Sequence, residues 1–317
     1  TMTETNNTVI VVFSWITLGL MISSIVGAFL TIVTFSIHSS IRTYPITLIM
    51  YLCCCIVIGF EAFLMAFEPW IYTTGGVCVV VAICVHYFFL ANFLWTFCVA
   101  FNFYQMIVRR NREAPSLEKY YHVASWGIPA IYCAFTGGFA EYGNLGGVCY
   151  IKSAVVRFVC FFIPGLVIIS SNAVLFFFIA REIHETLSGA PKSDKRDRMK
   201  EFRVYLSIFI SIGLSWIFGY LEFLLPFAVV SDIFFILFSI FTPMQGILIF
   251  FFYATNPKVL AAWMHLFGRC LPFCDRMADM LTNTQTSSRS NPSRSGPSRS
   301  SSSSASASAS MSSSNAL

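Results

Sequence analysis

The sequence predicts an all-α membrane protein, a bundle of seven transmembrane helices, and three observations lead to this fold class. Hydrophobic residues make up 56% of the 317 residues, charged residues only 11%, and the mean hydropathy is +0.72. Such a composition leaves too little polar surface for a water-soluble globule. The apolar residues form seven runs of about 20 or more, the length that a helix needs to cross the hydrocarbon core. Runs this long and uniform do not fit barrel strands.

The seven predicted spans form one transmembrane domain, residues 9–254. They cover residues 9–37, 45–67, 78–108, 120–140, 154–183, 203–225 and 232–254. Residues 1–8 precede them and are predicted to be an extracellular N-terminus. This segment has no basic flank of the kind that opens a cleavable signal peptide, and the apolar run after it is long enough to span. We therefore expect the first span to act as its own signal.

Basic residues set the predicted orientation, because Lys and Arg gather in the short cytoplasmic loops of membrane proteins. The third and fifth predicted loops are rich in them, and the residues of interest there are Arg109, Arg110, Lys195, Arg196, Arg198 and Lys200. Toward the opposite face the sequence has only Lys152 and Arg157. The N-terminus is therefore predicted to lie outside and the C-terminus inside.

Two cysteines are predicted to face the oxidising outer compartment. Cys78 opens the third span on its outer side, and Cys149 lies in the second outer loop, within GNLGGVCYIK. We expect a disulfide between them, which would tie this loop to the bundle; two free thiols are the alternative. On the same side, the sequon Asn6-Asn7-Thr8 makes Asn6 a candidate for glycosylation.

The segment after the last span is predicted to stay at the cytoplasmic surface. In NPKVLAAWMHLFGR, residues 256–269, apolar residues recur at helical spacing, so the stretch should lie in the interface as an amphipathic helix. Cys270 and Cys274 follow it and are candidates for palmitoylation. The Ser-rich residues 282–317 are predicted to be disordered and open to kinases and arrestin-like proteins; a merely solvated tail is the alternative.

Ionisable side chains on the outer half of the spans are the candidates for ligand contacts, because such groups in lipid are costly and usually face the bundle interior or water. These candidates are Glu61, His86, Arg157 and Glu222, with Lys152 in the adjoining loop. Arg157 is the first choice for an anionic ligand, since a guanidinium matches phosphate or carboxylate geometry. The alternatives are snorkelling or an ion pair with Glu222 for Arg157, and hydrogen bonds between helices for Glu61 and His86.

Several stretches resemble known receptor families. LWTFCVAFNFYQMIVRR, LEKYYHVASWGIP and an outer-loop Cys-Tyr followed by Arg157 and Pro164 are similar to the cyclic-AMP-receptor-like family of G-protein-coupled receptors. HYFFLANFLW, SIGLSWIFG and QGILIFFFYATNP resemble the adhesion and secretin-like receptors. Both resemblances imply a plasma-membrane receptor of the G-protein-coupled type, which senses an extracellular ligand and activates a heterotrimeric G protein. The first implies a small anion such as a cyclic nucleotide, the second a peptide or tethered agonist.

The resemblance to the adhesion-type receptors also implies roles for individual residues. Trp216, Gly219 and Gln245 match activation positions and are expected to carry a conformational switch on the inner half of the bundle. Pro164 and Pro243 would remove backbone hydrogen bonds from the helices around this switch and permit kinks there. The six basic loop residues named above would then contact the G protein.

Other classes of function have weaker support. A retinal-binding pump needs a Schiff-base lysine in the last span, and residues 232–254 contain none. The sequence shows no spacing typical of a metal site, so no metal, other cofactor or enzymatic activity is predicted, and no nucleic-acid partner either. A seven-helix transporter stays open as the less favoured alternative, although no internal repeat supports it.

Overall fold

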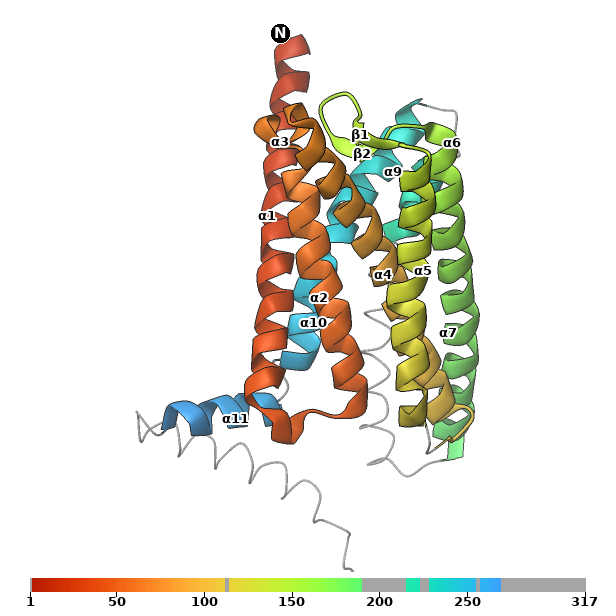
Figure 1. Cartoon of the computed structure of the whole chain (residues 1–317). Helices are drawn as coiled ribbons and strands as arrows, with labels where there is room; N and C mark the ends of the chain where they lie inside the picture. The colour runs from red at the N-terminus through yellow and green to blue at the C-terminus, as the bar shows by residue number, and fades with distance from the viewer. Residues whose placement is uncertain (1, 112–113, 190–214, 223–227, 255–256, 269–317) are drawn as a thin grey trace, which may run out of the picture.

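The computed structural model describes residues 2–111, 114–189, 215–222, 228–254 and 257–268, and most of them are helical. Long helices run side by side, with a small β-hairpin at the end where the N-terminus lies (Figure 1). In chain order the elements are α1 (Met2–Ile37), the 3₁₀ turn η1 (Ser39–Ile41), α2 (Tyr44–Met65), α3 (Pro69–Thr73), α4 (Gly75–Ile107), the 3₁₀ turn η2 (Ala114–Leu117), α5 (Glu118–Gly138), β1 (Tyr142–Asn144), β2 (Cys149–Ile151), α6 (Ala154–Arg157), the π-helical turn η3 (Phe158–Phe162), α7 (Ile163–Gly189), α9 (Ala228–Phe241), the 3₁₀ turn η4 (Thr242–Met244), α10 (Gln245–Ile249), the π-helical turn η5 (Phe250–Ala254) and α11 (Pro257–Gly268).

The described helices agree with the predicted spans. Within the described residues, five stretches are long and apolar enough to cross a membrane: Val11–Ile37, Tyr44–Met65, Gly75–Ile107, Ala154–Glu185 and Ser231–Tyr253. The helix α5 coincides with the predicted fourth span at 120–140, and residues 215–222, the described part of the predicted sixth span, are helical. The first helix begins at Met2, so the sequon at Asn6 lies within α1.

The helix α4 is the centre of the bundle. In its most apolar window 61% of the residues are buried, against 28% in the window of α1. Residues 89–96 are buried without a break over two turns. A helix that faces lipid would leave one stripe exposed, so this stretch of α4 is enclosed by its neighbours, among them α2, α5, α7 and the hairpin.

Two spans are interrupted, and a proline lies at each interruption. In the fifth span, η3 separates α6 from α7, and Pro164 follows it closely. In the seventh span, Pro243 lies in η4 between α9 and α10. Proline has no amide hydrogen, so it cannot donate to the carbonyl four residues earlier. The carbonyls of Cys160 and Ser239 therefore lose their usual helical donors.

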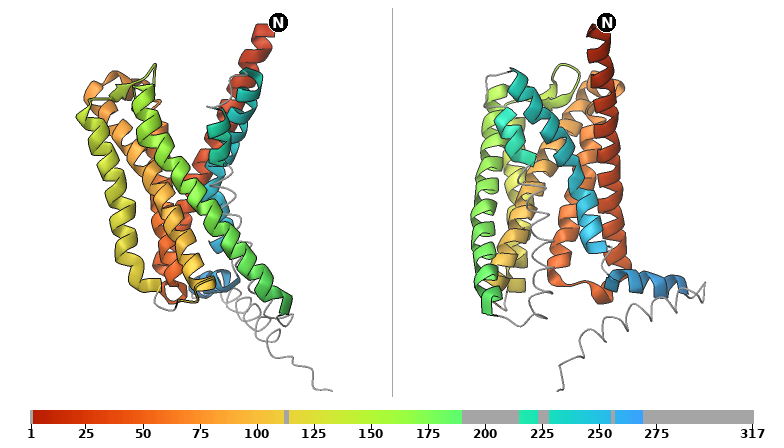
Figure 2. Two further views of the ribbon diagram at one scale, coloured as in Figure 1. Left: turned by 90° about the vertical axis from the view of Figure 1, so that its right-hand side faces the viewer. Right: turned by 180° about the vertical axis from the view of Figure 1, so that it is seen from behind.

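The helices α1 and α10 lie against each other, as the view from behind shows (Figure 2), and glycines permit their close approach. The amide of Gly246 donates a hydrogen bond to Ser24 Oγ at 2.8 Å. A Cβ atom on Gly246 would overlap the carbonyl oxygen of Ser24, and one on Gly27 would come within 2.9 Å of the Ile247 Cα. The packing of the seventh span on the first thus requires glycine at both positions.

The helix α11 lies at the end of the bundle opposite the N-terminus, where it runs nearly perpendicular to α1 and extends outward past it (Figure 1). The Trp263 ring on α11 lies edge-on to the His38 ring just before η1, with centroids 5.1 Å apart. This helix falls within residues 256–269; its location at a membrane surface stays a prediction. Cys270, Cys274 and residues 282–317 lie outside the described residues.

Candidate functional site

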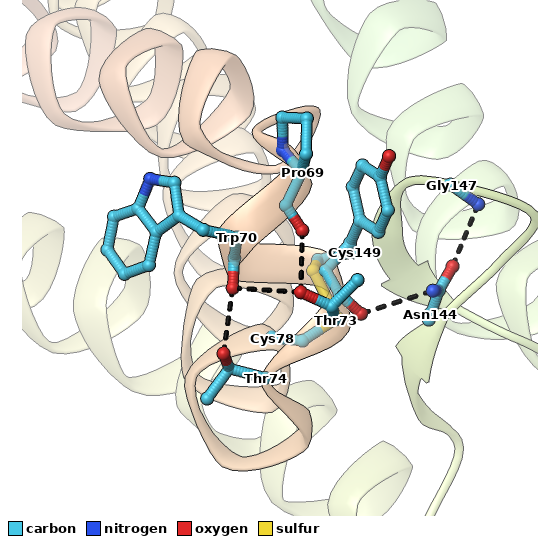
Figure 3. The surroundings of a disulfide bond; sticks show 9 residues. Pro69, Trp70, Thr73, Thr74, Cys78, Asn144, Gly147 and Cys149 are labelled. Carbon is cyan, nitrogen blue, oxygen red and sulfur yellow. Dashed lines mark hydrogen bonds between the residues drawn. A yellow bond between two sulfur atoms is a disulfide. The ribbon is translucent and has the colours of Figure 1, made fainter.

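The β-hairpin covers the outer end of the bundle and is pinned to the neighbouring helices. A disulfide joins Cys149 in β2 to Cys78 near the start of α4, with Cα atoms 5.2 Å apart, as the sequence predicts. The amide of Cys149 also donates to the Ala66 carbonyl at 3.0 Å. Close to the disulfide, Asn144 Nδ2 donates to the carbonyl of Tyr72 at 3.1 Å (Figure 3). The hairpin is therefore held by both covalent and hydrogen bonds.

The side of the hairpin that leads into α6 is tied down by Arg157. Its Nη1 atom donates to the Ile151 carbonyl at 3.0 Å. Nearby, the Ser153 amide donates to Glu141 Oε2 at 3.1 Å. The guanidinium predicted to meet an anion thus contacts the hairpin backbone. In the part of the chain that the structure describes, no ion pair joins it to Glu222 or to another acid.

Aromatic rings from three neighbouring spans surround Trp216 below the hairpin. The centroid of its indole lies 4.6 Å from Phe93, 5.1 Å from Phe238, 5.7 Å from Phe161 and 6.0 Å from Phe89, each pair edge-to-face. Such pairs stabilise beyond the burial of their area. We call these five rings the aromatic cluster; it joins the third, fifth, sixth and seventh spans.

The switch is predicted on the inner half of the bundle, and in the structure Trp216 contacts the first turns of the fifth span. Phe161, which Trp216 contacts, lies about two turns beyond Ala154, where the fifth span begins on the outer side. Within the predicted sixth span, residues 203–225, Trp216 lies close to the middle. Gly219 lies next to the same cluster, because a Cβ atom there would come within 3.0 Å of the Phe238 ring.

Gln245, the third predicted switch residue, forms a reciprocal amide pair with Asn92 of α4. Asn92 Nδ2 donates to Gln245 Oε1 at 3.4 Å, and Gln245 Nε2 donates to Asn92 Oδ1 at 3.3 Å. Both side chains are buried. A buried amide is costly unless it is paired, so the two residues hold the seventh span against the third.

His86 lies fully buried where α4, the hairpin and the fifth span meet. Its Nδ1 atom lies 2.6 Å from the Tyr142 hydroxyl oxygen and its Nε2 atom 3.1 Å from the Cys160 carbonyl oxygen. Because a carbonyl only accepts, we assign the proton of the neutral imidazole to Nε2, and Nδ1 accepts from Tyr142. The structure thus gives His86 the bonds between elements that were the alternative to a ligand contact.

The other candidate ligand residues are spread around the outer end. Glu61 is exposed on α2, and Lys152 is exposed after β2. Glu222 is half-buried, and its backbone carbonyl accepts from Ser231 Oγ at 3.1 Å. Among the described residues, no hydrogen bond or ion pair joins any two of the predicted ligand residues, His86 and Arg157 included.

At the opposite end of the bundle, α4 leads into the predicted G-protein-contact residues Arg109 and Arg110, which are exposed. Arg110 adopts a positive φ of 50°, which is uncommon outside glycine and turns the chain away from the helix. Its Nη2 atom lies 3.3 Å from Glu182 Oε1 on α7. Exposed ion pairs of this kind contribute little to stability. The remaining four predicted contacts lie outside the described residues: Lys195, Arg196, Arg198 and Lys200.

Sequence reasoning missed most of the partners of the predicted site residues. Asn92 did carry a signal, because an amide in an apolar span usually faces another helix. Phe161 and Phe238 carried none, since the chain has 34 phenylalanines and every predicted span holds at least two. Tyr142 lies in a loop, and its contact with His86 depends on how the hairpin folds back.

Comparisons with known proteins define the family. The model of the seven-transmembrane receptor (secretin family) matches residues 9–249. Over 257 residues the chain is 46% identical to the latrophilin receptor-like protein A of Dictyostelium discoideum, covering 81% of this chain and 83% of the relative. The human adhesion G-protein coupled receptors G4 and D1 are 26% and 27% identical over 78% and 80% of this chain. The chain spans only 8% and 29% of these two receptors.

The chain belongs to the secretin family of seven-transmembrane receptors. The predicted fold class, a seven-helix bundle of the G-protein-coupled receptor type, is confirmed, as is the prediction of an integral multi-pass protein of the plasma membrane. Of the two resemblances in the sequence, the one to the adhesion and secretin-like receptors is confirmed. Membership of a receptor family also supports the prediction that the chain is not an enzyme.

Proposed function

We propose that this chain is the signalling domain of a receptor that senses an extracellular ligand and activates a heterotrimeric G protein. The observation that carries the proposal is the aromatic cluster, in which one indole contacts rings of the third, fifth and seventh spans. Closely packed interiors adopt discrete arrangements and do not deform continuously. A displacement of Trp216 would therefore repack several spans at once, which is what a receptor switch requires.

We infer that the ligand is a peptide that presents apolar side chains. Aromatic side chains lie between the hairpin and Trp216. The centroid of the Phe161 ring lies 6.1 Å from that of Tyr150 and 5.7 Å from that of Phe162. A ligand that reached these rings would meet an apolar surface, which favours apolar groups. The charged candidates, in contrast, are spread around the outer end, and Arg157 is bonded to the hairpin backbone. These observations favour the peptide over the small anion.

Receptors carrying Arg157→Ala are expected to separate the two ligand models. If a small anion binds Arg157, removing one partner of a desolvated charge pair costs about 2–5 kcal/mol. This equals roughly 30-fold to several-thousand-fold in affinity. The peptide model predicts instead that cyclic AMP and related anions elicit no nucleotide exchange from the unmodified receptor. Dose–response curves on surface-expressed receptor, with Arg157→Lys as control, decide: a cyclic-AMP response that Arg157→Ala shifts steeply would overturn the peptide model.

Neutralising the basic fifth loop is expected to abolish nucleotide exchange while surface expression persists. The variant changes Lys195, Arg196, Arg198 and Lys200 to glutamine together. The physical reason is that clustered positive charge steers and orients a partner of complementary charge. A matched control changes Arg289, Arg294 and Arg299 in the tail to glutamine. Exchange measured with purified G protein should be lost only in the loop variant; exchange that survives there would show that this loop does not engage the G protein.

A further inference from the structure

We propose that His86 is a positioning residue that connects the outer hairpin to the aromatic cluster, by giving the fifth span the hydrogen bond that Pro164 removes. The signalling consequence rests on the receptor function proposed above, whereas the geometry stands without it. His86 acts through three neighbours: the backbone of the fifth span, the hairpin and the aromatic cluster.

The first neighbour is the backbone of the fifth span. In a regular helix the Cys160 carbonyl would accept from the amide of residue 164, but that residue is proline. The turn η3 is π-helical, with the Ile163 amide reaching back to the Phe158 carbonyl. Polar backbone groups inside a membrane need a partner within the protein. His86 Nε2, 3.1 Å away on α4, provides that donor to Cys160.

The second neighbour is the hairpin, at the other end of the imidazole. Nδ1 of His86 lies 2.6 Å from the hydroxyl oxygen of Tyr142, which lies on β1 and is 5% exposed. Burial raises the pKa of the Tyr142 hydroxyl well above its usual range, so it remains a proton donor. Because β2 pairs with β1 and carries the disulfide to α4, this hydroxyl belongs to a pinned element. The imidazole thus bridges the hairpin and the fifth span.

The third neighbour is the aromatic cluster, reached through the residue that follows Cys160 in the chain. This residue is Phe161, and its ring lies 6.0 Å from the His86 ring and 5.7 Å from the Trp216 ring. On the other side of the same turn, the Tyr220 hydroxyl donates to the Phe162 carbonyl at 2.8 Å. The π-helical turn is therefore held by α4 on one side and by the sixth span on the other. A movement of the hairpin reaches Trp216 through His86 and Phe161.

The test follows Trp216 directly in the full chain, purified in detergent and labelled with 5-fluorotryptophan. The ¹⁹F resonance of Trp216 is assigned by its loss in Trp216→Phe. His86→Phe and Tyr142→Phe each break the bridge and should shift or broaden this resonance. His86→Gln keeps a nitrogen donor for the Cys160 carbonyl and should restore most of the original signal. Tyr87→Phe is the matched control. It also removes a tyrosine hydroxyl, but this one lies on α4 next to His86 and donates to the Trp126 carbonyl.

A double-mutant cycle tests the role of the proline. His86→Phe should lower the Tm by several degrees, since it leaves the Cys160 carbonyl without this donor. In a Pro164→Ala background the restored amide can serve that carbonyl, so most of the loss should disappear. An equal loss in both backgrounds would overturn the proposal, as would an unchanged Trp216 resonance in folded His86→Phe.

Two features of these experiments keep their outcomes separate. Where His86→Phe does not fold, Tyr142→Phe decides the question with the same resonance, since it removes a single hydroxyl. Neither readout involves a ligand or a G protein. An unmodified receptor that catalyses no nucleotide exchange would therefore contradict the proposed function and leave the bridge intact, whereas an unchanged Trp216 resonance would contradict only the bridge.

Discussion

Replacing Gly246 by alanine is expected to remove most of the receptor from the cell surface, because the new methyl group would overlap the backbone of α1. The Cβ atom would clash with the Ser24 carbonyl oxygen, which cannot rotate away as a side chain can. Relief requires the two helices to separate, which also lengthens the 2.8 Å hydrogen bond from the Gly246 amide to Ser24 Oγ. Overpacking alone costs about 1–3 kcal/mol, and with the lost bond we expect about 3 kcal/mol or more.

The control for this prediction lies on the same helix pair. A methyl group added to Gly19 of α1 would meet no neighbouring group within 4 Å, so Gly19→Ala should retain surface expression and Tm. Gly27→Ala, which would bring its Cβ within 2.9 Å of the Ile247 Cα, should behave like Gly246→Ala. Surface labelling in cells and the Tm in detergent measure all three variants. Normal expression of Gly246→Ala would show that α1 and α10 do not pack this closely.

Hydropathy was sufficient to predict the fold class, because crossing a bilayer imposes a length and an apolar composition on each helix. It did not locate the first turn of α1, which begins at Met2 and not at residue 9. Hydropathy marks the part of a helix that lipid can surround, whereas backbone hydrogen bonds decide where the helix begins. The disulfide was predictable for a different reason. The predicted topology places both Cys78 and Cys149 on the outer side, so their pairing could be expected.

The site was predictable only in part, because a single sequence does not show how each helix is rotated. His86, Arg157 and Glu222 were all predicted on the outer half, but their side chains have different surroundings. His86 bridges two elements, and Arg157 binds a carbonyl of the hairpin. Glu222 is half-buried. Pro164 was visible in the sequence as a residue without an amide hydrogen, yet the donor that the Cys160 carbonyl finds instead, His86, lies 78 residues before Pro164 in the chain. Such pairings become visible only once the helices are packed.

Trp216→Ala is expected to cost about 3–5 kcal/mol of stability, the range for removing a large buried aromatic ring. The indole is 6% exposed and lies edge-to-face with four phenylalanine rings, so its loss would leave a cavity between four spans. Because the surrounding rings can then repack in several ways, the coupling between the outer and inner ends should be lost as well. Nucleotide exchange, normalised to surface expression, should fall to the level of the unliganded receptor.

The neighbouring residue supplies the control that distinguishes a switch from a general loss of packing. Ile217 lies on the same turn but is 43% exposed, so Ile217→Ala should change Tm and exchange only slightly. Trp216→Phe keeps a ring in the cluster and should recover part of the Tm, while exchange should remain altered because the smaller ring cannot contact all four phenylalanine rings together. If Trp216→Ala matched Ile217→Ala in both measurements, the aromatic cluster would not be the element that connects the two ends of the receptor.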